Sequence, residues 1–174
     1  IRDYKGLDLL LDAWAQLRRA GRTEGRRLIV AGEFYTAREP YLNRIADNGL
    51  QDEVLLHDRF IPDDDVKYYF SAADFVVQPY KTATQSGVTQ IAYQFCVPMV
   101  VTKVGGLAEI VPDGRVGYVC EPTPEGVAGA IERMYEGDTL QRFRENCVEE
   151  RRRFSWEEMC SRITELYGLV ASGK

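Results

Sequence analysis

The chain has 174 residues, of which 45% are hydrophobic and 28% are charged, the composition of a soluble globular protein rather than a disordered one. Its net charge is −5 and no basic stripe is interleaved with aromatic residues, so no nucleic-acid partner is expected. No apolar run approaches the ~18 residues of a membrane span and no signal peptide is evident. We therefore expect a cytoplasmic protein, while a peripheral membrane contact of a longer protein stays open.

The cysteines indicate neither a metal centre nor a disulfide scaffold. Cys96, Cys120, Cys147 and Cys160 are scattered, without a C-x-x-C pair, and His57 is the one histidine. Zinc sites need clustered ligands at short spacing. Reduced thiols and no bound metal are expected.

Helices and strands are expected to alternate along the chain. The first helix, over 6–20, is predicted by apolar residues at helical spacing: Leu7, Leu10, Leu11, Trp14 and Leu17. Further helices are expected at 39–48, 62–72, from about 87, 123–135, 139–152 and 156–169. Short apolar runs predict strands at 27–32, 53–57, 74–78 and 117–120, with another inside VPMVVT.

This alternation predicts an α/β fold: a Rossmann-like, doubly wound parallel sheet with helices on both faces and further helices at the C-terminus. No repeat or linker divides the sequence, so we expect one domain over 1–174. Ligands of such sheets bind beyond the carboxyl ends of the strands. The loops expected there are 32–34, 58–62, 79–87 and 102–109.

The start of the chain is unusual for this fold. It begins at Ile1, without a methionine, and enters a helix almost at once. The strand that should precede this helix is missing or reduced to Ile1 and Arg2. We therefore expect a fragment of a longer protein, its second half.

The loop before the central helix has the chemistry of an anion site. Thr82, Thr84, Gln85 and Ser86 are followed by Gly87, and the loop contains no carboxylate. The helix expected to begin at Gly87 directs free N–H groups and the positive end of its dipole at this loop. A phosphate is the simplest ligand for such a place. An ordinary serine cap is the competing interpretation of Ser86 and Gly87.

Three further features are candidates for the same site. Lys5 would neutralise a diphosphate, or it is an ordinary surface lysine. Gly105 and Gly106 follow a strand and would let the backbone approach a ligand, or they form a turn. Glu109 would accept hydrogen bonds from both hydroxyls of a ribose or hexose, or it is a favourable charge at a helix start.

Other eye-catching residues have plainer explanations. Asp63, Asp64 and Asp65 precede a helix and are interpreted as capping residues with charges that suit the dipole. His57 is interpreted as structural, and the 151–153 arginine run as a solvated helix end. A dinucleotide site lacks its G-x-G-x-x-G motif.

Several motifs together resemble a known family. They are KG-x-x-x-LL-x-A, LIVAG, AADFVVQPY and G-V-x-x-x-A-Y-x-F-x-V-P-M-V-V-T-x-V-G-G-L-x-E-I-V. From Tyr4 to about Leu169 the chain resembles the C-terminal domain of group 1 retaining glycosyltransferases, also called glycosyltransferase family 4, which have the two-domain GT-B fold. The resemblance implies that this domain binds a nucleotide diphosphate sugar, without metal or other cofactor, facing an N-terminal acceptor domain.

The resemblance also assigns roles to residues. Lys5 matches the family's diphosphate-binding lysine, and Glu109 matches the glutamate of V-G-G-L-x-E-I-V. The expected donor-binding residues are Gly32, Glu33, Thr84, Gln85, Ser86, Gly87, Gly105, Gly106 and Glu109. The family typically has two glutamates near the donor, and the chain has Ala83 and Ile91 at those positions.

The expected activity is sugar transfer to an acceptor hydroxyl with retention, in cell-surface polysaccharide or glycolipid biosynthesis, with the fragment alone inactive. Because the two glutamates are absent, a non-catalytic nucleotide-sugar-binding or assembly module stays open. A two-domain nucleotide-sugar 2-epimerase is a weaker alternative, since its acid–base residues are not evident.

Overall fold

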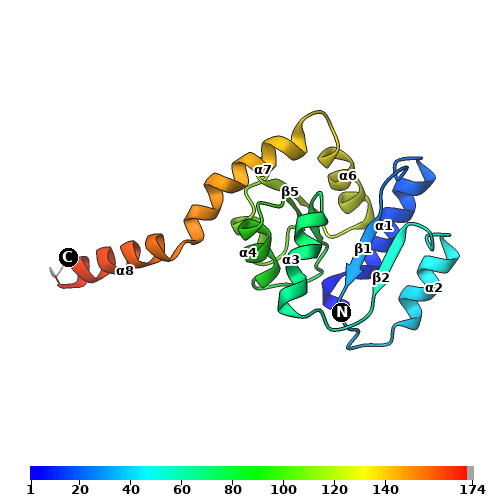
Figure 1. Ribbon diagram of the computed structural model, residues 1–174, viewed down its shortest axis with the longest axis horizontal. Helices are drawn as coiled ribbons and strands as arrows, with labels where there is room; N and C mark the ends of the chain where they lie inside the picture. The colour runs from blue at the N-terminus through cyan, green and yellow to red at the C-terminus, as the bar shows by residue number, and fades with distance from the viewer. Residues whose placement is uncertain (172–174) are drawn as a thin grey trace.

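The computed structural model describes residues 1–171, with helices and strands in alternation (Figure 1). The strands are β1 (Leu28–Ala31), β2 (Val54–His57), β3 (Val76–Gln78), β4 (Met99–Thr102) and β5 (Gly117–Cys120). The α-helices are α1 (Leu7–Arg19), α2 (Glu39–Asp47), α3 (Asp63–Ala72), α4 (Gly87–Gln94), α5 (Leu107–Ile110), α6 (Pro124–Met134), α7 (Thr139–Glu150) and α8 (Trp156–Ala171). Short 3-10 turns, η1 (Asp3–Lys5) and η2 (Arg151–Phe154), precede α1 and α8. The predicted order and type of the elements are confirmed.

All strand pairs are parallel, as predicted, but the strands form two sheets rather than one. β1 pairs with β2, and β4 lies between β3 and β5. Within residues 1–171, no strand pairs with the edge of β1 or of β3 that faces the other sheet. The strand order is therefore interrupted between β1 and β3.

A groove of about 500 Å³ occupies this interruption. β1 contributes Leu28 and Ile29 to its wall, β3 contributes Val76 and Val77, and Trp14 of α1 lies at its base. Its apolar lining and the unpaired strand edges beside it are the surroundings of a sheet strand.

The first residues of the chain span the groove at the carboxyl ends of the strands. Ile1 donates from its amino group to the Glu33 carbonyl and accepts from the Tyr35 N–H at 2.9 Å, the bonding pattern of a parallel strand pair around Phe34. The Tyr4 carbonyl accepts from the Lys81 N–H at 2.8 Å. Residues 1–4 thus link the chain beyond β1 to the chain beyond β3.

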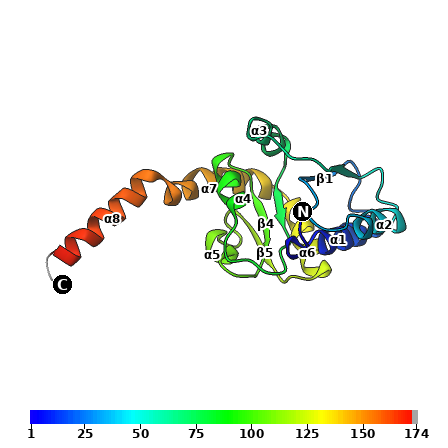
Figure 2. The same cartoon turned by 90° about the horizontal axis from the view of Figure 1, so that it is seen from below.

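Helices cover both faces of the three-stranded sheet. Val77, Val100 and Tyr118 pack on α6 and α7, and the alternate residues Met99 and Val101 pack in the cluster that contains α4 and α5. The sheet of β1 and β2 packs by one face against α1, α2 and α6. On its other face, Ile29 and Leu55 are exposed. Figure 2 shows α1, α2 and α6 together on one side, with α3 on the opposite side.

Side-chain capping agrees with the sequence at two helices and departs from it at a third. Ser86 caps α4 by accepting from the Val88 N–H, and Thr123 caps α6 by accepting from the Gly126 N–H. The predicted capping by Asp63–Asp65 is wrong, since the N-cap of α3 is Pro62 and no side chain caps it. These aspartates lie inside the first turn, where their charge still suits the dipole.

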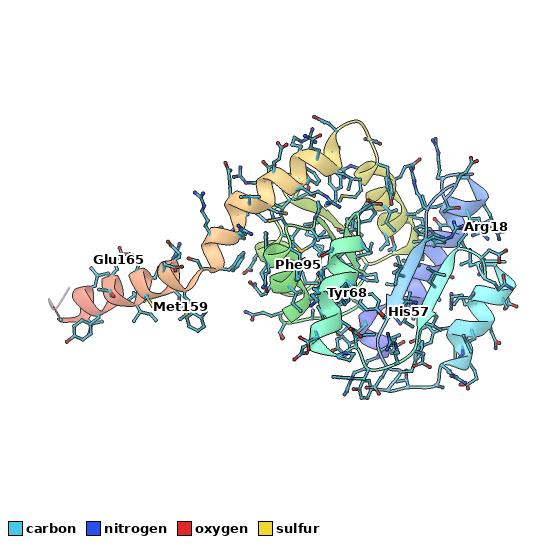
Figure 3. All side chains as sticks on the ribbon, viewed as in Figure 1. Arg18, His57, Tyr68, Phe95, Met159 and Glu165 are labelled. Atoms are coloured by element: carbon cyan, nitrogen blue, oxygen red, sulfur yellow. The ribbon has the colours of Figure 1, made fainter. Side chains whose placement is uncertain are left out.

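α8 extends away from the rest of the molecule (Figure 1). Met159 and Glu165 lie on this arm (Figure 3), and Trp156, Tyr167 and Val170 are exposed along it. Within residues 1–171, no helix has both the length and the apolar character needed to cross a membrane.

Glu150 makes acid-sensitive contacts at the end of α7. It accepts from Arg153 at 2.8 Å and from Arg115 at 2.7 Å, and these bonds lower the pKa of its carboxyl below the ordinary value. A lowered folded-state pKa stabilises the fold above the unfolded pKa and stops doing so as pH falls through the folded one. Glu150→Gln should therefore destabilise the chain at pH 7, and its difference from the wild type should shrink as pH falls through the lowered folded-state pKa of Glu150. Urea unfolding across this range tests it; a difference independent of pH would contradict it.

Candidate functional site

The loops after β3 and β4 lie in direct backbone contact. Gly106 donates its N–H to the Thr84 carbonyl at 3.0 Å. Gly105 has φ +50°, and a Cβ at this position would lie 1.7 Å from the Ala83 carbonyl oxygen. The close approach of the glycine pair is thus to the neighbouring loop, which it holds beside the start of α4.

The start of α4 is built as the sequence predicted. Ser86 is the buried N-cap, and its Oγ accepts from the Val88 N–H at 3.3 Å. Gly87 is exposed and has open space where a Cβ would lie. Thr84 and Gln85 are exposed beside it. A polar, carboxylate-free surface therefore adjoins the positive end of the helix.

Lys5 joins this site through Tyr80. Its Nζ donates to the Tyr80 hydroxyl at 2.8 Å and lies 4.1 Å from the centre of the Tyr80 ring. The Tyr80 hydroxyl is in turn 3.1 Å from Ser86 Oγ. Lys5, at the end of η1, is therefore connected to the N-cap of α4 by two hydrogen bonds.

Tyr80 is the residue that the sequence analysis missed. The motif AADFVVQPY marked it as typical of the family, but no role was assigned to it. The contact between Lys5 and Tyr80 joins positions 75 apart in the sequence, which local spacing does not reveal.

A second lysine nearby is neutralised. Lys81 Nζ lies 2.9 Å from carboxylate oxygens of both Asp3 and Asp8. The hydrogen bonds that Lys81 donates to Asp8 and, next in size, to Asp3 raise the pKa of Lys81 above its ordinary value. Lys5 forms no ion pair within residues 1–171, so its charge remains available to an anion.

The loop after β1 places Gly32 and Glu33 at the same edge of the molecule. Gly32 has φ +130°, and Glu33 is exposed with its carboxylate beside the Tyr35 hydroxyl at 3.3 Å. The Phe34 N–H donates to Asp58 at 3.4 Å, which ties this loop to the loop after β2. These residues adjoin the N-terminal segment, but no hydrogen bond joins Gly32 or Glu33 to Ser86 or Thr84 in the described part of the chain.

The remaining positions that the sequence analysis singled out are Glu109, Ala83 and Ile91. Glu109 is exposed in the short helix α5. Ala83 and Ile91 are half-buried, and Ala83 packs against the core cluster around Tyr93. Apolar side chains therefore occupy the two positions at which the resemblance predicts acidic ones.

His57 has a partner that supports its structural interpretation. Its Nδ1 lies 2.8 Å from the Tyr69 hydroxyl. No group of acidic, histidine or cysteine side chains in residues 1–171 is arranged to hold a metal ion.

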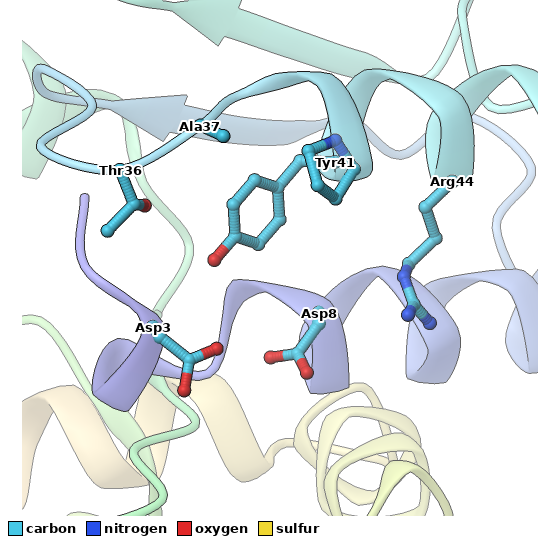
Figure 4. Close-up of a pocket in the computed structure, with 7 residues that line it drawn as sticks. Asp3, Asp8, Thr36, Ala37, Tyr41 and Arg44 are labelled. Carbon is cyan, nitrogen blue, oxygen red and sulfur yellow. The ribbon is translucent and has the colours of Figure 1, made fainter.

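A pocket of about 300 Å³ lies to one side, between the start of α1 and the loop before α2 (Figure 4). Asp3, Asp8, Tyr41 and Arg44 are among its lining residues, and it contains none of the predicted site residues. Arg44 is paired with Asp12 rather than directed at a ligand. The pocket is therefore separate from the Lys5–Tyr80–Ser86 cluster.

The family of glycosyl transferases group 1 matches residues 1–137. The chain belongs to this family. It is 32% identical, over 96% of its own length, to a protein named D-inositol 3-phosphate glycosyltransferase 2 from Catenulispora acidiphila. It spans only 41% of that relative.

Solved structures show the same fold. HepE of Anabaena in complex with UDP-glucose matches with a TM-score of 0.79 at 22% identity, over 97% of this chain and 46% of HepE. The C-terminal domain of LpcC, a group 1 glycosyl transferase of Francisella tularensis, matches with a TM-score of 0.74 at 20% identity, over 86% of this chain and 79% of that domain. The fold is that of the C-terminal half of GT-B glycosyltransferases.

Proposed function

We propose that this chain is the donor-binding domain of a retaining glycosyltransferase, which transfers a sugar from a nucleotide diphosphate sugar to an acceptor hydroxyl. The observation that carries the proposal is the hydrogen-bonded connection from Lys5 through Tyr80 to Ser86. It combines a cation with a helix N-terminus, and both favour a diphosphate. UDP-glucose bound to HepE, a protein of the same fold, supports this class of ligand.

In this proposal the leaving diphosphate is stabilised by the chain itself. Negative charge grows on the diphosphate as the sugar leaves, and preorganised donors near that charge lower the barrier. Lys5 and the N–H groups at the start of α4 fill this role without metal or cofactor. Thr84 and Gln85 offer neutral hydrogen-bonding groups to the sugar, in place of the absent carboxylates.

We also propose that the acceptor side belongs to a further domain of a longer, cytoplasmic protein. The chain spans less than half of the Catenulispora acidiphila relative and of HepE, and the groove between β1 and β3 has the lining of a strand site. Polypeptide ahead of Ile1 would run into that groove beside β1, given the parallel bonding of Ile1 around Phe34. Alone, the chain would bind donor but transfer nothing, and the full protein's acceptor would be a cell-surface polysaccharide or glycolipid precursor.

Calorimetry with UDP, GDP and ADP tests the donor site. We expect millimolar or tighter binding of at least one of them, and Lys5→Ala should weaken it on the order of tenfold by removing a charged contact with phosphate. Lys67→Ala is the matched control, because Lys67 also lies over a tyrosine ring, that of Tyr68, but on α3.

Two outcomes would count against the donor site. No binding of any of the three nucleotides at millimolar concentration, with the fold intact, contradicts the proposed function. Equal affinities of the Lys5 and Lys67 variants would remove Lys5 from the site.

A non-catalytic nucleotide-sugar-binding module is the alternative, favoured by the apolar packing of Ala83 and the half-buried Ile91. The full-length protein assayed with a panel of nucleotide sugars separates the two. Binding without turnover of any donor would favour the module.

A further inference from the structure

Tyr80 is buried between the two elements of the donor site. Its side chain is only 5% exposed, and its ring meets the ring of Tyr4 edge-on at 6.2 Å. Its carbonyl accepts from Thr102 Oγ1 at 2.6 Å, which fixes this part of the loop to β4. Because both the backbone and the ring of Tyr80 are fixed by these contacts, its hydroxyl group occupies a defined position.

The direction of the hydrogen bonds follows from the donor inventory. An ammonium group has donors only, so Tyr80 must accept from Lys5. The charge of Lys5 polarises the phenol and makes its own O–H a better donor toward Ser86 Oγ. Since Ser86 Oγ then accepts from Tyr80 and from the Val88 N–H, the hydroxyl hydrogen of Ser86 is left for another acceptor.

We propose that Tyr80 is a positioning residue for the diphosphate. It holds the ammonium of Lys5 beside the start of α4 and turns the hydroxyl hydrogen of Ser86 toward the ligand. A phosphate oxygen then meets a cation, a hydroxyl donor and a helix N-terminus together. The inference rests on the proposed donor site and adds the residue that joins its parts.

The test compares UDP with uridine, which lacks the phosphates. Tyr80→Phe keeps the ring, the burial and the ring face under Lys5, and removes only the hydroxyl. We expect the affinity for UDP to fall on the order of tenfold, as for loss of a hydrogen bond to a charged group. The affinity for uridine should stay within about twofold, because the hydroxyl acts on phosphate alone. Calorimetry measures UDP, and ligand-observed NMR measures uridine.

Tyr4→Phe is the matched control. The ring of Tyr4 also lies near Lys5, with its centre 5.1 Å from Nζ, but Tyr4 is 41% exposed and its hydroxyl makes no hydrogen bond within residues 1–171. This variant should bind UDP as the wild type does. Lys5→Ala combined with Tyr80→Phe should weaken UDP binding by less than the sum of the two single losses, since Tyr80 acts partly through Lys5.

Each outcome decides the matter. Unchanged UDP affinity in Tyr80→Phe, or equal losses for UDP and uridine, overturns the positioning role while the donor site stands. Additive losses in the double variant also overturn it. Failure of the wild type to bind UDP, GDP or ADP overturns the proposed function, and this inference with it.

Discussion

Replacing Gly105 by alanine is expected to lower the free energy of unfolding by about 2–4 kcal/mol and to abolish UDP binding. The new Cβ would lie 1.7 Å from the Ala83 carbonyl oxygen, and Gly105 has φ +50°, where other residues are strained. The loop after β4 must therefore move away from the loop before α4. That movement breaks the bond from the Gly106 N–H to the Thr84 carbonyl, which braces the polar loop.

Urea unfolding and calorimetry with UDP measure the two effects. Gly25→Ala is the control, because Gly25 has a similar φ of +71° but open space around its Cβ position. It should cost roughly 1 kcal/mol, the price of the dihedral alone, and leave UDP binding intact. If Gly105→Ala resembled Gly25→Ala in both measurements, the two loops would not depend on each other.

Filling the groove between β1 and β3 is expected to have the second large effect. A designed strand of about five valine-rich residues fused ahead of Ile1 should raise the free energy of unfolding by about 2–5 kcal/mol, from apolar burial and pairing on both edges. Ile1 already bonds in parallel fashion around Phe34, so the fused residues enter the groove in register with β1. The added side chains would pack on Val76 and Trp14, which line the groove.

The matched control is the same fusion with proline at alternate positions. Proline removes the N–H donors that one edge requires and is poorly tolerated inside a sheet. The urea midpoint should be highest for the valine-rich fusion, lower for the proline-containing fusion and lowest for the unextended chain. Equal stabilities of the two fusions would show that the groove does not accept a strand.

The fold was predictable because its signals are local. Apolar spacing in residues 6–20 and the short runs that became β1, β2 and β5 each depend on neighbours in the sequence. The caps Ser86 and Thr123 are likewise local. The capping prediction for Asp63–Asp65 failed because acidic residues are favoured both at the N-cap and in the first turn of a helix. The sequence alone does not distinguish these two positions.

The site was predictable in its ingredients but not in its connections. Lys5 and Ser86 were identified singly, whereas Tyr80, which links them, bonds to a lysine 75 positions away. The glycine pair was expected to let the backbone approach a ligand or to form a turn, and the structure shows that the backbone of Ala83 and Thr84 lies close to it. A glycine in a sequence indicates that some group lies close to the backbone, but it does not identify that group, because a ligand and a neighbouring loop exclude a Cβ equally.

The separation of the two sheets should also lower the cooperativity between the two parts of the molecule. Hydrogen-bonded strands respond together, but no ladder crosses from β1 to β3 in residues 1–171. The half formed by α1, α2, β1 and β2 is therefore joined to the remainder mainly through side chains, above all where α1 packs on α6. Such packed helices slide more readily than paired strands separate. Lys5 precedes α1 and Ser86 precedes α4. A ligand that contacts both residues would therefore connect the two halves and resist their relative movement.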